Sequence, residues 1–139
     1  MSNASAPLVR RLLLLLPALL AATLVAAPQS LAAQDGPVFE LSDVSSAPRL
    51  TSMERAAEQI RQAYPDQLRS RGVAGRVQLE AVVGSDGKVE AESVVVLFSE
   101  HAELGEAARR VASSFGFQPG QREGRAVRTR VVIPVIFQP

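Results

Sequence analysis

The chain has 139 residues, no cysteine, and 15 basic against 14 acidic side chains. A chain of this length has room for one modest hydrophobic core, and the lack of cysteine excludes disulfides and thiolate metal sites, so the burial of apolar side chains must stabilise the fold. The near-zero net charge and an aromatic content of 4% give no support to nucleic-acid binding through a broad basic surface.

Residues 1–33 have the pattern of a secretory signal. Two arginines precede an apolar run from Leu12 to Ala27, and a stretch of mostly small residues follows it. Pro17 interrupts the run, which is shorter than the roughly 20 apolar residues that a membrane-spanning helix needs. We expect cleavage after Ala32 or Ala33 and therefore an exported chain, and an uncleaved membrane anchor is the alternative.

The part of the chain after the signal divides into a linker and one domain. Residues 34–50 mix proline, serine and aspartate without helical periodicity, which indicates an extended linker. The domain is expected to span residues 51–139. No internal repeat is present.

The start of the domain predicts a helix, a kink and a short helical turn. The segment Thr51-Ser52-Met53-Glu54 matches a capping box, in which hydroxyl and carboxylate groups satisfy the free amides of a first helical turn. Pro65 interrupts this helix and opens a second one, Asp66 to Arg71, which Gly72 closes. The first helix has one apolar face with i, i+3, i+4, i+7 spacing, made of Met53, Ala56, Ala57 and Ile60.

Two strands and a further helix follow. From Arg76 to Val83 apolar and polar residues alternate, which predicts a half-buried strand. A Gly-Ser-Asp-Gly turn at 84–87 joins it to a valine-rich second strand at Lys88 to Leu97, so the two form a hairpin. A helix is predicted over His101 to Ser114, and Gly116 stops it. Its apolar stripe consists of Leu104, Ala107, Ala108, Val111 and Phe115.

The last apolar run contains a proline that indicates its place in the sheet. Alternation puts Val127, Val131, Ile133, Val135 and Phe137 on one face. Pro134 has no amide to donate, so this strand is expected at a sheet edge with the missing donor pointing away from its neighbour.

The order of the elements predicts the topology of the sheet. The second strand reaches the third through a helix, so the two should run parallel, with the first strand between them and antiparallel to both. The expected fold is α+β, with a three-stranded antiparallel/mixed sheet of order 2-1-3 covered on one face by two helices. One side of the C-terminal strand is left open.

Candidate catalytic and metal-binding residues are few. His101 is the only histidine, and no second histidine or cysteine exists to complete a transition-metal site or a nucleophilic arrangement. Asp86, Glu90 and Glu92 lack the spacing of a calcium loop and are expected to form an acidic turn and a solvated strand face. We therefore expect no enzyme activity, no cofactor and no metal.

One local basic cluster occurs near the end of the chain. It consists of Arg122, Arg125, Arg128 and Arg130. Such a cluster would steer an acidic peptide to the strand edge, or it would only prevent edge-to-edge aggregation. The sequence favours neither interpretation.

An ordered set of motifs over roughly residues 50 to 138 resembles the C-terminal domain of the TonB energy transducer. The motifs are Tyr64-Pro65, Leu68, Gly72-Val73, Gly75, the strand Val77 to Val83, Asp86-Gly87-Lys88-Val89, Leu104 with Ala107-Ala108, Phe115-Gly116-Phe117-Gln118-Pro119, Gly124, and Ile133-Pro134-Val135-Ile136-Phe137. Each motif occurs in other proteins, and their order carries the resemblance.

The resemblance implies a periplasmic domain that binds the N-terminal segment of an outer-membrane receptor as a further strand on the sheet edge. Strand addition suits the open edge, because unpaired amides and carbonyls bind an extended peptide with little dependence on its sequence. Carried over to this sequence, the binding edge runs from Arg128 to Ile136. Its expected contact residues are Arg128, Arg130, Val131, Val132, Ile133, Val135 and Ile136.

The sequence departs from the family pattern in ways that bear on energy transduction. Phe115 replaces the usual tryptophan, the expected cleavable signal takes the place of a permanent anchor, and the sequence lacks the long proline-rich spacer. The resemblance therefore supports binding of a receptor segment or another extended peptide more strongly than coupling to inner-membrane motor proteins. Two alternatives remain open, a transducer anchored by an uncleaved Leu12 to Ala27 segment and a homodimer that self-associates through the same edge.

Overall fold

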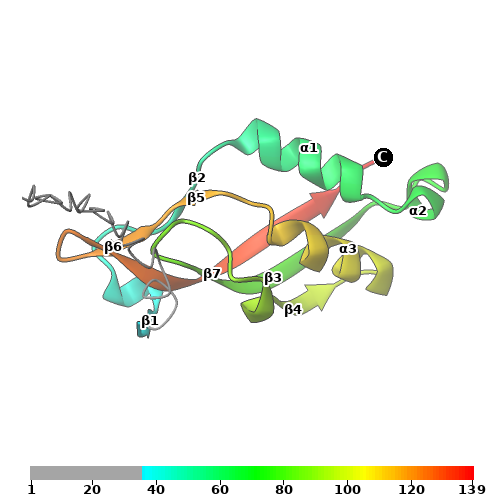
Figure 1. Ribbon diagram of the computed structural model, residues 1–139. Coiled ribbons are helices and arrows are strands. Elements are labelled where there is room, and N and C mark those ends of the chain that lie inside the picture. The colour runs from blue at the N-terminus through cyan, green and yellow to red at the C-terminus, as the bar shows by residue number, and fades with distance from the viewer. Residues whose placement is uncertain (1–35) are drawn as a thin grey trace, which may run out of the picture.

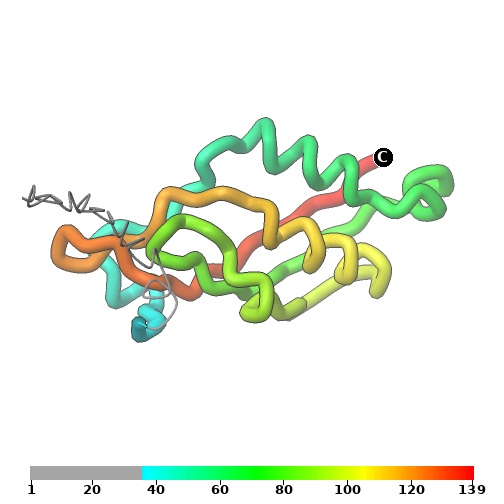
Figure 2. Tube along the Cα trace, in the orientation of Figure 1, coloured from blue at the N-terminus to red at the C-terminus, as the bar shows by residue number. Residues whose placement is uncertain are grey.

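The computed structural model describes residues 36–139, so the expected signal lies outside the described residues. Figures 1 and 2 show the path of the chain. The elements are β1 (Val38–Phe39), the 3₁₀ helix η1 (Leu41–Asp43), β2 (Arg49–Leu50), α1 (Met53–Ala63), α2 (Asp66–Ser70), β3 (Gly75–Val83), the 3₁₀ helix η2 (Ala91–Ser93), β4 (Val95–Ser99), α3 (Ala102–Ala112), β5 (Phe117–Gln118), β6 (Gly120–Arg122) and β7 (Arg125–Phe137).

The main sheet confirms the predicted order of the three principal strands. β3 pairs antiparallel with β4 on one side and with β7 on the other, so the order β4-β3-β7 is the expected 2-1-3 arrangement. The structure adds β1, which pairs parallel with the start of β7, and β6, which forms a hairpin with it. β2 and β5 form a separate small antiparallel pair.

The helices cover one face of the sheet, and the alternation of the strands explains which face. The odd-numbered side chains of β3 from Val77 to Val83 and of β7 from Val131 to Phe137 join the apolar stripe of α3 in one hydrophobic core. Leu79 and Leu104 are fully buried there. The predicted face of α1 is confirmed only in part, because Ala56 is buried whereas Met53 is 70% exposed.

The first helix begins one residue later than the capping box predicts. The Ser52 hydroxyl, rather than that of Thr51, accepts from the Arg55 amide at 3.2 Å and caps α1. Thr51 instead donates its hydroxyl to the Gly116 carbonyl at 2.9 Å, because the chain before α1 lies against the β5 segment. At the other end Tyr64 leaves the helix, as the following proline requires.

The predicted second strand is shorter and begins later than expected. The turn after β3 closes as predicted, and the Glu90 amide donates to the Val82 carbonyl at 2.9 Å. The chain then forms η2, where the Ser93 hydroxyl accepts from the Val82 amide at 2.8 Å and donates to the Glu90 carbonyl at 2.7 Å. This side chain replaces a strand partner for Val82, so β4 starts only at Val95.

Residues 36–50, which we call the N-terminal strap, differ from the expected free linker. β1 pairs with β7, β2 pairs with β5, and the amides of Ser45 and Ser46 donate to the Gln121 carbonyl. Figure 2 shows the strap, in cyan, beside β6 and the start of β7, in orange. The segment is extended as predicted, but its backbone groups bond to the domain. No helix within residues 36–139 is long and apolar enough to cross a membrane.

Candidate binding edge and groove

The hydrogen bonds of β3 determine which backbone groups of β7 face outward. The carbonyls of Arg76 and Val82 accept from the amides of Glu100 and Glu90, both on the β4 side. Even-numbered residues of β3 therefore point to β4, and odd-numbered residues point to β7. In register these odd residues pair with the odd residues of β7, such as Leu79 with Ile133. The even residues of β7 consequently direct their amides and carbonyls away from the sheet.

These outward groups form a free edge, which we define as Arg130–Ile136. Within residues 36–139 no strand pairs with the outer side of β7 beyond Thr129. The edge offers amides at Arg130, Val132 and Ile136, whereas Pro134 offers only a carbonyl. The side chains of Val132 and Ile136 are each 53% exposed. The predicted position of the proline, with its missing donor away from the neighbouring strand, agrees with this geometry.

The start of the predicted edge is already occupied by the chain itself. Val38 and Phe39 of β1 pair with Arg128 and Thr129, so Arg128 does not belong to an open edge. The Arg128 guanidinium forms a bidentate pair with the Glu90 carboxylate, at 2.7 Å for both nitrogens, and also bonds the carbonyl of residue 36. The edge that is open therefore begins at Arg130.

The odd-numbered and even-numbered residues of the predicted edge point their backbone groups to opposite sides of β7. Val131, Ile133 and Val135 point their side chains into the core and bond their backbone to β3. These three residues hold β7 against β3 and the core, and their backbone groups are not available to a partner. Of the predicted set, Arg130, Val132 and Ile136 present outward backbone groups that β1 leaves uncovered.

Two of the four arginines of the basic cluster form ion pairs within the chain. Arg130 lies between Glu80, at 2.8 Å, and Glu40, at 3.0 Å, and their hydrogen bonds and charges raise the pKa of the guanidinium. Arg128 is paired with Glu90, and the Arg122 guanidinium lies 4.8 Å from the centre of the Phe39 ring. These contacts fasten the strap and the hairpin to β7, which favours a structural role over the steering of an acidic peptide.

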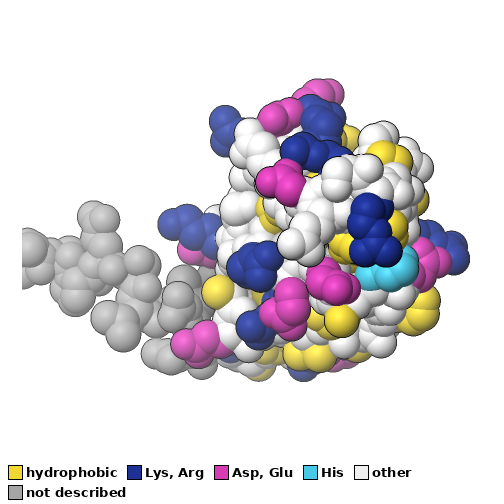
Figure 3. All heavy atoms as spheres, turned by 90° about the vertical axis from the view of Figure 1, so that its right-hand side faces the viewer, with side chains coloured by type: hydrophobic (Ala, Val, Ile, Leu, Met, Phe, Trp, Pro, Cys, Tyr) yellow, Lys and Arg dark blue, Asp and Glu magenta, His cyan; other side chains and the backbone are white. Residues whose placement is uncertain are grey.

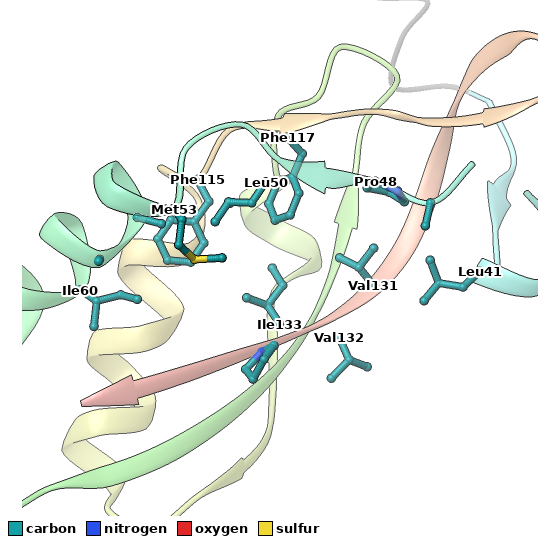
Figure 4. Close-up of a pocket in the computed structure, with 14 residues that line it drawn as sticks. Leu41, Pro48, Leu50, Met53, Ile60, Phe115, Phe117, Val131, Val132 and Ile133 are labelled. Atoms are coloured by element: carbon teal, nitrogen blue, oxygen red, sulfur yellow. The ribbon is translucent and has the colours of Figure 1, made fainter. Parts of the chain in front are cut away.

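An apolar groove runs beside the free edge. It has a volume of about 370 Å³ and lies between the strap and α1 on one side and β7 on the other. Figure 4 shows Leu50, Met53 and Phe115 facing Ile133 and Val131 across this space. Leu41 lies near the end of the groove beside Val131. The groove and the free edge thus form one continuous surface.

No sequence pattern pointed directly to this groove. The apolar residues of α1 and of the strap were expected to contact the core or to lie in a linker. Met53 instead lines the groove, as do Leu41 and Leu50 from the strap. The sequence analysis had placed Met53 on the apolar face of the first helix, and the structure exposes this residue at the groove.

The remaining candidates stay apart from this surface. His101 precedes α3 and is exposed. Among the described residues, no group of histidine, aspartate and glutamate is arranged to hold a metal. Figure 3 views the end of the molecule that carries α2, where basic and acidic side chains are interspersed.

Comparisons with known proteins address the fold and the family. The structure is similar to the solution structure of the Pseudomonas aeruginosa TonB C-terminal domain, with 22% identity, a TM-score of 0.50, and coverage of 75% of this chain and 96% of that one. A Helicobacter pylori TonB C-terminal domain matches with 23% identity and a TM-score of 0.35, over 64% of this chain and 85% of that one. No curated protein matches the sequence. The family model of the Gram-negative bacterial TonB protein C-terminal region matches residues 60–139. The chain therefore belongs to the TonB C-terminal domain family.

Proposed function

We propose that this protein binds an extended peptide as an added strand on the free edge of β7, and that its partner is the N-terminal segment of an outer-membrane TonB-dependent receptor. One observation carries the proposal. The amides and carbonyls of alternate residues from Arg130 to Ile136 point outward, beside a groove that can take side chains. The protein acts by binding and not by catalysis.

Family membership supplies the biological setting. It implies a periplasmic location and an interaction with outer-membrane receptors in TonB-dependent transport. The proposal adds the site and the mode of binding. A periplasmic domain without an anchor would engage a receptor but would not transmit force, so N-terminal processing decides between an adaptor and a transducer.

The free edge is suited to a weak and reversible complex. Each new backbone hydrogen bond contributes only about 0.5–1.5 kcal/mol net, because water bonds the same groups before binding. Pro134 removes one donor from the middle of the edge, so a visiting strand keeps one carbonyl unbonded or hydrated. Affinity must therefore come from several bonds together with side-chain burial.

The proposal is tested by a titration that reads each amide. The isotope-labelled mature chain is titrated with synthetic peptides from the N-termini of the host's outer-membrane receptors. We expect the largest shifts at the amides of Val132 and Ile136, with little change at Val95 on the opposite edge of the sheet. Shifts confined to β4 or to the helices would contradict binding at this edge.

A further inference from the structure

Half of the residues that line the groove lie outside the part of the chain that matches the family. The match begins at residue 60, whereas Leu41, Leu50 and Met53 lie before it. The strap and most of α1 therefore add a wall that the family match does not cover. This wall faces Val131 and Ile133, the two core-facing residues of β7 next to the free edge.

A strand added to the free edge would direct alternate side chains into the groove. An added strand lies about 4.8 Å from β7, and its successive side chains point to opposite faces of the sheet. Every second side chain would point toward the helical layer, as Val131 and Ile133 do. These side chains would enter the space between β7 and Met53, and the intervening ones would lie on the open face beside Val132.

We propose that the strap and α1 give this edge a preference for peptides that carry bulky aliphatic side chains at two alternate positions, i and i+2. The inference rests on the proposed function and adds the class of peptide that the edge accepts. It also assigns Met53 and Leu50 as residues that determine specificity.

The chemistry of the surface determines the occupant. The lining is aliphatic and aromatic, so aliphatic side chains gain free energy there and uncompensated polar groups lose it. The outward amides and carbonyls of the free edge need hydrogen-bonding partners along the same line, which a hydrocarbon ligand does not supply. An extended peptide satisfies both requirements at once.

The strap also limits the register of the peptide. β1 covers the outer side of β7 up to Thr129, and the Glu40–Arg130 ion pair lies directly after it. Leu41 stands near this end of the groove. The first groove-facing side chain of a visitor is therefore placed no earlier than the level of Val131.

The preference is tested with three nine-residue synthetic peptides on the mature full chain. One carries leucine at positions 4 and 6 with threonine and lysine elsewhere, one carries serine at both positions, and one carries leucine at positions 4 and 5. Calorimetry should give about tenfold or more weaker binding for both altered peptides, because leucine at positions 4 and 5 leaves one buried side chain fewer and serine at both positions leaves two fewer. The amides of Val132 and Ile136 are followed in parallel.

Variants locate the preference in the groove. Met53→Glu should weaken binding of the alternating peptide about tenfold and leave the fold intact, because an acidic residue suits the first turn of a helix and Met53 is 70% exposed. Met53→Leu should retain the preference. Val95→Glu, on the opposite edge where Val95 is 51% exposed, is the matched control and should change nothing.

The outcomes separate the two proposals. Equal binding of the three peptides, with shifts at Val132 and Ile136, would overturn the side-chain preference and leave strand addition standing. Binding that shifts Met53 and Leu50 but no edge amide would overturn the extended-peptide occupant. If neither these peptides nor receptor peptides shift the edge amides, the proposed function itself fails.

Discussion

A second proline in β7 would show whether the outer edge binds the partner. Val132 and Pro134 have the same parity, so the Val132 amide points away from β3 and contributes nothing to the β3–β7 ladder. Val132→Pro should therefore cost the fold little, whereas the visiting strand loses one hydrogen bond. That loss is about 1 kcal/mol, or roughly fivefold in the dissociation constant.

Two controls make the change interpretable. Val132→Thr keeps the amide and the branched shape, and it should bind receptor peptides nearly as the wild type does. Ile133→Pro removes a bond to Leu79 within the sheet and a buried side chain, so it should lower the free energy of unfolding by about 2–4 kcal/mol. Urea denaturation measures stability, and calorimetry with a receptor peptide measures affinity.

Two results would refute the reasoning. If Val132→Pro destabilises the protein as strongly as Ile133→Pro, the assigned orientation of the backbone is wrong. If Val132→Pro and Val132→Thr bind receptor peptides equally well, the outer edge of β7 does not form the complex.

Three further predictions concern the framework that holds the edge. Gly87→Ala should lower the free energy of unfolding, measured in urea, by about 2 kcal/mol or more, because Gly87 has a φ of +81° and a Cβ there would lie 2.0 Å from the Phe117 carbonyl oxygen. Gly124→Ala is the control, because Gly124 has a φ of +76° but a Cβ there would have no atom within 4 Å. It should lose only the conformational part, about 1 kcal/mol. Glu90→Gln should cost about 1–3 kcal/mol by breaking the half-buried pair with Arg128, and an unchanged urea midpoint would show that the pair is not stabilising. Hydrogen bonds from Arg61 and Gln62, and the charge of Arg61, lower the pKa of Glu58. Its stabilisation is therefore complete above the ordinary value of 4.5 and is lost as pH falls through the lower folded pKa, so the stability advantage of the wild type over Glu58→Gln should shrink in acid; an advantage independent of pH would exclude this linkage.

The predicted cleavage of the signal at residues 32–33 can be tested by the mass of the exported protein. Cleavage after Ala32 or Ala33 would give a mature chain that begins at Ala33 or Gln34, which mass spectrometry of the exported protein detects. A chain that retains Leu12 to Ala27 would instead support the anchored transducer.

The hairpin after β3 shows where sequence patterns stop being sufficient. Alternation from Arg76 to Val83 predicted β3 closely, because a half-buried strand must change face at every residue. The valine-rich run after the turn carried no comparable alternation, and the Ser93 side chain replaced a strand partner at Val82. A side-chain bond of this kind depends on a local turn that composition does not reveal.

Sequence patterns alone predicted the order of the main helices and of the three principal strands, the core-facing residues of β3, α3 and β7, and the edge position of the strand that contains Pro134. These properties follow from periodicity and from one missing amide, which are local. The cover of the strap over Arg128 and the place of Met53 beside a groove became apparent only in the folded chain. Those features depend on contacts between segments about 90 residues apart, such as Glu40 with Arg130, and no local pattern encodes which distant segment a polar or apolar side chain will meet.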